Sequence, residues 1–110
     1  MAFKVKYSEQ AANDLDEIIR YISDVLFSPQ SAENFYKAVN EKLGLLREHP
    51  YIFPLYHDDK LRSDGYRFAV IGNYLMFYLV DDGSSIVNIA RILYGKRNIT
   101  SAFLSHPANE

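Results

Sequence analysis

Residues 66–97 decide the fold: they read YRFAVIGNYLMFYLVDDGSSIVNIARILYGKR and predict three consecutive β-strands. The strands are expected at residues 67–71, 74–80 and 85–93. Gly72-Asn73 tolerates the positive φ of a two-residue hairpin turn, and Asp81-Asp82-Gly83 is a second turn signal. Such a meander buries its apolar surface only if other elements cover its faces, so the rest of the chain must supply at least one cover.

The chain before the meander predicts a short strand followed by two helices. Phe3, Val5 and Tyr7 alternate with lysines, which is typical of a strand at a sheet edge. Ser8 is a good N-cap for a first helix that should stop near Phe27. Its apolar residues recur at spacings of three and four: Ala12, Leu15, Ile18, Ile19, Ile22, Val25 and Leu26.

Ser28-Pro29 predicts the start of a second helix, and His49-Pro50 predicts its end. Two helices with a short connection form an antiparallel hairpin, whose apolar stripes need the sheet as a common surface. The predicted fold class is therefore α+β, an antiparallel β-sheet with an N-terminal helical hairpin packed on one face. We expect one domain over residues 1–104 and a flexible C-terminal tail over residues 105–110.

Composition narrows the class of protein. The chain has 110 residues, no cysteine and no long apolar run, so it predicts one cytoplasmic domain without disulfides or a membrane span. The net charge of −2 hides an asymmetry. Residues 1–59 carry 6 Lys/Arg and 10 Asp/Glu, whereas residues 60–100 carry 6 and 3. The meander half is therefore basic, which suits an acidic partner or nucleic acid.

The usual catalytic signatures are missing, since the sequence has no Gly-rich phosphate loop, nucleophile elbow or HExxH. His49, His57 and His106 all fall in predicted loops or the tail. His57-Asp58-Asp59 has no second histidine at a useful spacing, so we expect no metal and no cofactor. The helix carboxylates, Asp14 and Glu17 among them, are expected to face solvent.

Alternate residues of a strand share a face of the sheet, so the predicted strands divide into two sets. The first face is expected to carry Phe68, Val70, Tyr74, Met76, Tyr78, Val80, Ile86, Asn88, Ala90 and Ile92. The second face is expected to carry Arg67, Ala69, Ile71, Leu75, Phe77, Leu79, Val87, Ile89, Arg91 and Leu93. Arginine is not buried without a partner. We therefore expect the helical hairpin on the first face.

The second face then forms an apolar trough, with the guanidinium groups of Arg67 and Arg91 near each other at one end. A patch of that size usually marks a binding surface. The expected partner-binding residues are Arg67, Ile71, Leu75, Phe77, Leu79, Ile89, Arg91 and Leu93. Two alternatives remain open: residues 99–104, as a short turn of helix or a strand remnant, cover the face, or local carboxylates such as Asp64 and Asp81 hold the arginines.

These elements, with several short motifs, resemble the RelE/ParE superfamily of bacterial toxins. The motifs are Tyr66-Arg67, the run Gly72-Asn73-Tyr74-Leu75-Met76-Phe77-Tyr78, the run Ile89-Ala90-Arg91-Ile92-Leu93-Tyr94-Gly95-Lys96-Arg97-Asn98, and the pair Pro50 and Pro54. The resemblance extends from Phe3 to about Ile99. It implies the toxin of a type II toxin–antitoxin pair, a plasmid-stabilisation or stress-response system, neutralised by a cognate antitoxin protein on the open face.

The branches of the superfamily differ in mechanism. RelE-like members cleave messenger RNA in the ribosomal A site, whereas ParE-like members poison DNA gyrase. Arg67 falls where RelE has a lysine, but Ala69 and Leu75 replace a second lysine and an arginine. Arg97 matches a RelE arginine, while Phe103 stands near the position of the terminal tyrosine. In the YoeB-like variant, histidine and tyrosine occupy the positions of Leu93 and Tyr94 here.

Since leucine and alanine can neither stabilise a phosphorane nor move a proton, the resemblance favours the ParE-like branch and gyrase binding without chemistry. Two alternatives stay open. One is a ribosome-dependent endoribonuclease that uses Arg67, Arg91, Tyr94, Lys96 and Arg97. The other is a non-toxic module that keeps only the antitoxin contact.

Overall fold

The computed structural model describes residues 2–105, which form one four-stranded sheet with the strand order β1-β4-β3-β2. The strands are β1 Lys4–Tyr7, β2 Arg67–Ile71, β3 Tyr74–Asp81 and β4 Ile86–Tyr94. The meander strands pair antiparallel, as predicted, and β1 joins β4 in parallel. β1 and β2 are therefore the two edge strands, which confirms the edge position predicted for the lysine-rich strand.

Two long helices follow β1 and form the predicted hairpin. α1 spans Glu9–Arg20, continues as a π-helical turn, η1, over Tyr21–Val25, and α2 spans Pro29–Glu48. Both predicted N-caps are present: Ser8 Oγ accepts a hydrogen bond from the Ala11 amide, and Ser28 Oγ accepts one from the Ser31 amide. The sequence did not indicate the π-helical turn, and it did not indicate the short helix α3, Asp59–Ser63.

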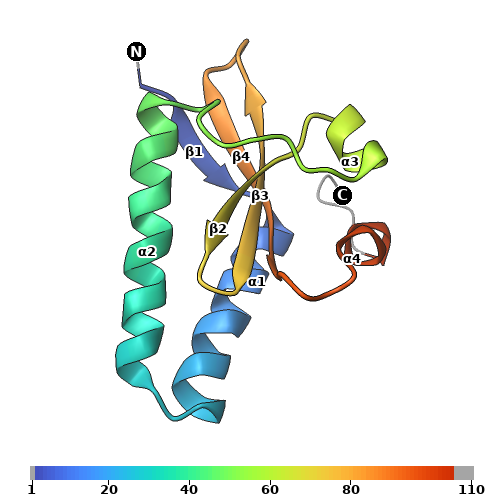
Figure 1. Cartoon of the computed structure of the whole chain (residues 1–110). Helices are drawn as coiled ribbons and strands as arrows, with labels where there is room; N and C mark the ends of the chain where they lie inside the picture. The colour runs from blue at the N-terminus through green and yellow to red at the C-terminus, as the bar shows by residue number, and fades with distance from the viewer. Residues whose placement is uncertain (1, 106–110) are drawn as a thin grey trace.

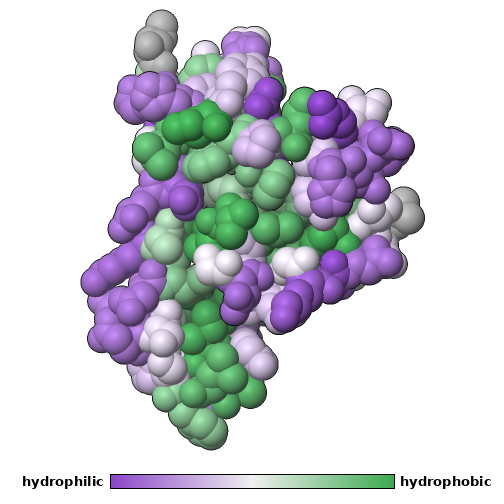
Figure 2. All heavy atoms as spheres, viewed as in Figure 1, coloured by the Kyte–Doolittle hydropathy of each residue, from purple (hydrophilic) through white to green (hydrophobic). Residues whose placement is uncertain are grey.

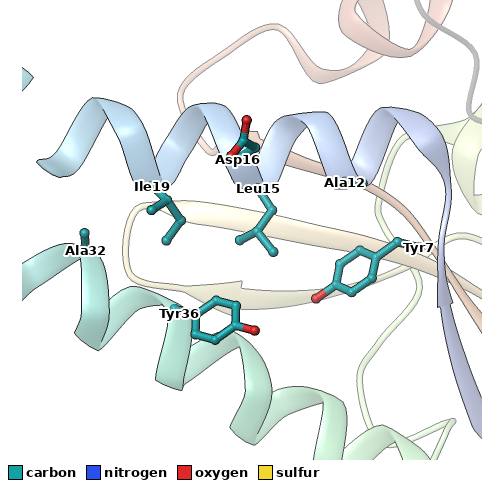
Figure 3. A pocket seen from close by; sticks show the side chains of 7 residues that line it. All are labelled: Tyr7, Ala12, Leu15, Asp16, Ile19, Ala32 and Tyr36. Atoms are coloured by element: carbon teal, nitrogen blue, oxygen red, sulfur yellow. The ribbon is translucent and has the colours of Figure 1, made fainter. Parts of the chain in front are cut away.

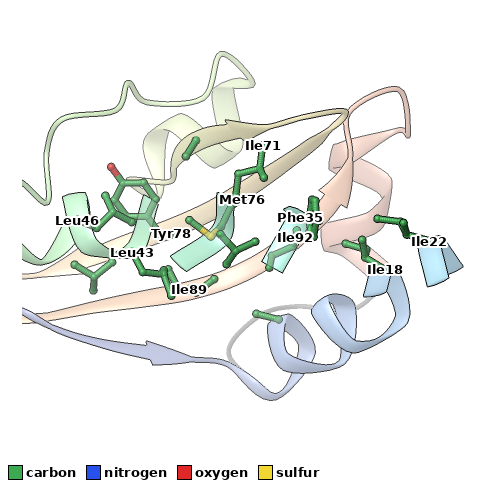
Figure 4. Packing of buried hydrophobic residues seen from close by; sticks show 14 of the residues in the cluster. Ile18, Ile22, Phe35, Leu43, Leu46, Ile71, Met76, Tyr78, Ile89 and Ile92 are labelled. Carbon is green, nitrogen blue, oxygen red and sulfur yellow. The ribbon is translucent and has the colours of Figure 1, made fainter. Parts of the chain in front are cut away.

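The sheet lies between two covers. In Figure 1 the hairpin of α1 and α2 lies on one side of the sheet, and α3 and α4, Ile99–Ser105, lie on the other. The larger core lies under the hairpin (Figure 4). Its strand residues are Ala69, Ile71, Met76, Tyr78, Val87, Ile89 and Ile92. Ile22, Phe35 and Leu43 of the helical hairpin are buried there, whereas Leu15 is only half-buried.

The predicted division of the sheet faces is correct for β3 and wrong for β2. The two-residue turn pairs Ile71 with Tyr74, and directly opposed residues point to the same side of a sheet. Ile71 and Ala69 therefore join Met76 and Tyr78 under the helices, and Phe68 points to the other side. Had the hairpin register been applied to the sequence, it would have fixed this parity.

In β4 the division fails for a different reason. A register irregularity opposite Phe77 and Tyr78 inserts one extra residue, because Phe77 pairs with Arg91 and Tyr78 pairs with Ile89. This β-bulge reverses the alternation within one strand. Val87 and Ile89 lie under the helices, where the simple alternation had placed Ile86 and Asn88, yet Ile92 lies on the predicted side.

The segment after β4 folds back over the sheet as α4, so the chain forms the short helix that was one of the two options for residues 99–104. The predicted loose tail, residues 105–110, lies outside the described residues except for Ser105, at which α4 ends. His106 likewise lies outside them. None of the helices in residues 2–105 is both long enough and apolar enough to span a membrane.

Candidate functional site

The second sheet face, which was expected to be open, is largely covered by the chain itself. Phe77 and Leu93 are buried beneath α4, where the Phe103 ring meets the Phe77 ring edge-on at a centroid distance of 5.3 Å. The cover consists of Tyr56, Leu61, Tyr66, Ile99, Ala102 and Phe103. The sequence left open whether a partner or residues 99–104 cover this face. In the structure, α4 covers its centre.

A strip of this face remains accessible beside α4. Phe68, Leu75 and Leu79 are half-buried, and Val70 on the edge strand is 55% exposed. Val70 pairs with Leu75 and Phe68 pairs with Phe77, so all of these side chains point to the same side of the sheet. The four residues Phe68, Val70, Leu75 and Leu79 are called the apolar strip below.

Arg91 does not project into a trough. It is 3% exposed, and its Nε and Nη2 donate to the two carboxylate oxygens of Asp14 on α1 at 2.8 and 2.9 Å. Asp14 Oδ2 also accepts from the Ile92 amide at 2.9 Å, and Arg91 Nη1 donates to the Ala102 carbonyl of α4 at 3.3 Å. One guanidinium therefore ties together α1, β4 and α4.

Arg67 lies apart from Arg91, so the expected pairing of their guanidinium groups is wrong. Arg67 pairs with Tyr78 and therefore faces the helical side, whereas Arg91 pairs with Phe77 on the opposite side. Arg67 Nη1 donates to the Phe53 carbonyl at 2.7 Å, and its guanidinium lies 4.9 Å from the centre of the Tyr51 ring. The two carboxylates considered as alternatives have other partners, since Asp64 pairs with Lys60 and Asp81 accepts a hydrogen bond from the Ser84 amide.

The expected partner-binding residues are thus divided among three environments. Ile71 and Ile89 are buried beneath the helices, and Phe77 and Leu93 are buried beneath α4. Only Leu75 and Leu79 remain half-exposed on the predicted face. Asp14 was expected to face solvent, but it pairs with Arg91. The sequence signal that could have shown this is the arginine in an apolar strand, because a buried arginine requires a carboxylate, which here comes from a helix distant in sequence.

The end of β4 and the segment after it present an exposed basic surface. Tyr94, the last residue of β4, is exposed, as are Lys96 and Arg97. The side chains of Lys96 and Arg97 make no ion pair within residues 2–105. Tyr94 and Arg97 line one cavity of about 360 Å³ with Glu17 and Tyr21. Of the five residues considered for a nuclease, the structure brings these two together and places Arg67 and Arg91 elsewhere.

The chemistry available in this cavity is limited. Burial raises the pKa of Tyr74, and the neighbouring phenols of Tyr21 and Tyr94 raise it further. A phenol whose pKa lies above its ordinary value stays protonated near neutral pH and is not a base. Within residues 2–105 no group of three His, Cys, Asp or Glu is placed to hold a metal. His57 packs instead on the Tyr56 ring.

A second concave surface lies on the outside of the helical hairpin. In Figure 3, Leu15 and Ile19 of α1 face Tyr36 of α2, with Tyr7 of β1 at one end. The cavity measures about 480 Å³, and Ala12, Asp16 and Ala32 complete its lining. It is mainly apolar, so it can accept apolar side chains of another protein but offers little for catalysis.

Comparison with known proteins gives one family and several structures of the same fold. The family model described as "ParE toxin of type II toxin-antitoxin system, parDE" matches residues 5–99. A chromosomal ParDE toxin–antitoxin system from P. aeruginosa aligns with a TM-score of 0.67 at 20% identity, covering 84% of this chain and 96% of that chain. No curated protein matched the sequence.

Two further solved structures belong to the RelE side of the superfamily. The toxin–antitoxin complex RelBE2 from Mycobacterium tuberculosis has a TM-score of 0.56 at 21% identity, covering 86% of this chain and 99% of that chain. A mutant of E. coli RelE in the free state has a TM-score of 0.59 at 15% identity, covering 93% of both chains. At such low identities these likenesses show a shared fold.

Proposed function

We propose, since the chain belongs to the family of ParE toxins of type II toxin–antitoxin systems, that it arrests growth by binding DNA gyrase without catalysing a reaction, and that a cognate antitoxin neutralises it. The family assignment confirms the RelE/ParE resemblance drawn from the sequence motifs. Gyrase as the target and the antitoxin as the partner come from that family relationship. The geometry supports the absence of chemistry and suggests where the antitoxin binds.

The observation that carries the non-catalytic part is that both sheet arginines are bound within the chain, Arg91 by a carboxylate and Arg67 by a backbone carbonyl. A ribonuclease of this superfamily needs several cationic and proton-transferring groups around one phosphate. Arg91 is held by Asp14 and the Ala102 carbonyl, and Arg67 is held by the Phe53 carbonyl. The buried Arg91 is not available to a phosphate unless its contacts break, and Arg67 lies on the other side of the sheet. The second face otherwise holds mainly apolar side chains, and burial raises the pKa of the Tyr56 and Tyr66 phenols beside them, so neither phenol is a base near neutral pH.

For the antitoxin we propose the apolar strip, with α4 as the element that moves aside. The strip leaves apolar side chains of two strands accessible to water, which is the usual mark of a docking surface. α4 is short, and an antitoxin segment that replaced it would also reach Phe77 and Leu93. These two residues, with Leu75 and Leu79, are the part of the predicted partner-binding set that this proposal retains.

The target is tested with purified toxin that has been separated from its antitoxin. We expect inhibition of gyrase supercoiling in vitro and DNA double-strand breaks in cells that express the toxin, with messenger RNA on programmed ribosomes left intact. Clean A-site cleavage that is lost in Arg97→Ala or Tyr94→Phe would instead establish the endoribonuclease. The shared cavity of Tyr94 and Arg97 is the observation that keeps this second candidate in view.

The antitoxin surface is tested separately with Val70→Glu, which places a charge in the apolar strip at an already exposed position. We expect weaker antitoxin binding and unchanged growth arrest. Leu45→Glu is the matched control, because Leu45 is an exposed leucine of α2 on the other side of the sheet. Equal antitoxin affinity in the two variants would exclude the strip. A chain that binds the antitoxin but never arrests growth would be the non-toxic module.

A further inference from the structure

Phe27, in the connection between η1 and α2, combines two unfavourable features. Its φ is +51°, a left-handed conformation that bulky residues rarely adopt, and its side chain is 86% exposed. Residues at this position after a helix are usually glycine or asparagine. Either would fit the backbone better than phenylalanine and would expose less apolar surface. Since this residue contributes little to folding where it stands, its observed conformation points to a role in binding.

The apolar surface continues from Phe27 along the end of the hairpin. Val25 and Leu26 are more than half exposed, and Tyr21 and Tyr94 are exposed on the neighbouring elements. Leu26, Tyr21 and Tyr94 line one cavity of about 690 Å³, so the surface extends from the loop to the sheet. Figure 2 shows hydrophobic surface at the end of the hairpin. The five residues Tyr21, Val25, Leu26, Phe27 and Tyr94 are called the tip surface below.

Charge is distributed unevenly around the tip surface. Lys96 and Arg97 follow Tyr94, and neither side chain makes an ion pair within the described part of the chain. Glu17 lines the adjoining cavity on the α1 side, and Asp24 lies in η1. A partner that covers the tip surface therefore meets two unpaired cations along the edge formed by the end of β4. Carboxylates at that edge would complement them.

We propose that the tip surface docks this toxin on its target protein. The Phe27 ring enters an apolar pocket of the target, and carboxylates beside that pocket face Lys96 and Arg97. The proposal rests on the proposed function in one respect, namely that the chain acts by binding a protein. A protruding aromatic residue surrounded by Tyr and Leu, with Arg at the border, is the composition expected of an interface anchor.

Other occupants fit this surface less well. A nucleic acid would engage the cations and tyrosines, but it offers nothing to Val25 and Leu26. A second copy of the chain could accept Phe27 in the apolar cavity between α1 and α2, which is lined by Leu15 and Ile19. That contact would be reciprocal in a closed dimer or repeated head-to-tail in a ring or filament, and each of these would raise the molar mass with concentration. The antitoxin is assigned to the apolar strip, on the opposite side of the sheet from the hairpin.

The test uses Phe27→Asn, which suits the left-handed backbone and removes the ring without opening a cavity. Ser85→Asn is the matched control, since Ser85 is the other described non-glycine residue with positive φ, at +55°, and it lies in the turn before β4. Both variants should melt at the wild-type temperature or above. Purified wild type and variants are compared for binding to purified DNA gyrase, binding to the antitoxin, growth arrest on induction, and molar mass by light scattering.

We expect Phe27→Asn to bind gyrase about tenfold more weakly or worse, the loss typical of a central interface aromatic, and to lose growth arrest in proportion. Its antitoxin affinity should be unchanged, and Ser85→Asn should match wild type throughout. Lys96→Glu combined with Arg97→Glu should give a similar loss that grows weaker at high salt.

The remaining outcomes separate this inference from the proposed function. If wild type binds gyrase and Phe27→Asn binds it equally well, the docking surface is wrong and the gyrase proposal stands. If wild type does not bind gyrase but arrests growth, the gyrase proposal is wrong. The docking surface is then tested by growth arrest alone: it is supported if Phe27→Asn no longer arrests growth and overturned if Phe27→Asn still does. Loss of antitoxin affinity, or concentration-dependent assembly of wild type that Phe27→Asn abolishes, overturns it as well. Wild type that neither binds gyrase nor arrests growth overturns both.

Discussion

Replacing Asp14 with alanine should destabilise the protein strongly, although aspartate on a helix surface is usually dispensable. The carboxylate accepts three hydrogen bonds, from Arg91 Nε, Arg91 Nη2 and the Ile92 amide. Its side chain is 12% exposed and that of Arg91 is 3% exposed, so water cannot replace these bonds fully. The variant removes the Asp14 carboxylate from a buried guanidinium and leaves a strand amide without its acceptor.

The expected loss is about 3–5 kcal/mol of unfolding free energy, the range for a buried ion pair broken by removal of one partner. Domains of this size are stable by about 5–15 kcal/mol, so Asp14→Ala should fold but unfold at a much lower denaturant concentration. Replacing both partners, as in Asp14→Leu with Arg91→Met, should recover much of the loss, because no buried charge then remains.

The assay is urea unfolding followed by far-UV circular dichroism, which suits a chain with no tryptophan. Asp16→Ala is the control on the same helix, since Asp16 pairs with Arg20 in an exposed ion pair. Such pairs contribute about 0–1 kcal/mol. If Asp14→Ala lost no more than Asp16→Ala, the Arg91 guanidinium would be adequately stabilised without Asp14, and the proposed neutralisation of Arg91 by Asp14 would be wrong.

Two further predictions concern the core and the loop helix. Leu43→Ala should lower the free energy of unfolding by about 2–5 kcal/mol, because Leu43 of α2 is 4% exposed where it packs against the sheet. Leu45→Ala, on the exposed side of α2, should change the free energy of unfolding by about 0.5 kcal/mol or less. Similar urea midpoints for the two variants would contradict this packing. Hydrogen bonds from the Leu61 amide and then the Thr100 hydroxyl lower the pKa of Asp58 below its ordinary value of 3.8. A lowered folded-state pKa stabilises the fold above the unfolded pKa, and this contribution is lost as the pH falls through the folded pKa. The urea midpoint of wild type should therefore exceed that of Asp58→Asn at neutral pH and approach it in acid, and a gap that stayed constant with pH would refute the assignment.

Several features were predictable from sequence because their causes are local. The Gly72-Asn73 turn set the meander, and the strand at residues 67–71 was predicted with its observed bounds. Ser8 and Ser28 marked both helix starts because a serine side chain satisfies an amide three residues away. The helical hairpin followed from the spacing of apolar residues, which is independent of what those residues contact.

Part of the candidate site was also within reach of the sequence. Lys96 and Arg97 were singled out as candidate residues directly after the last strand, and the structure exposes both there. Leu75 and Leu79 were correctly assigned to the second face. The left-handed Phe27 was not foreseen, because only the backbone path from the π-helical turn into α2 imposes its φ.

The amino-acid sequence by itself therefore determined the four strands and the two long helices, their order and the apolar character of both sheet faces. Only the tertiary structure decided how those faces are used. The bulge in β4 changes which residues face the helices, and it depends on pairing with β3. The fate of Arg91 depends on Asp14, 77 residues earlier in the chain, and α4 covers the face that the sequence left undecided. Local patterns cannot specify such contacts, because their stabilisation arises only when segments distant in sequence meet and exclude water from a shared charge.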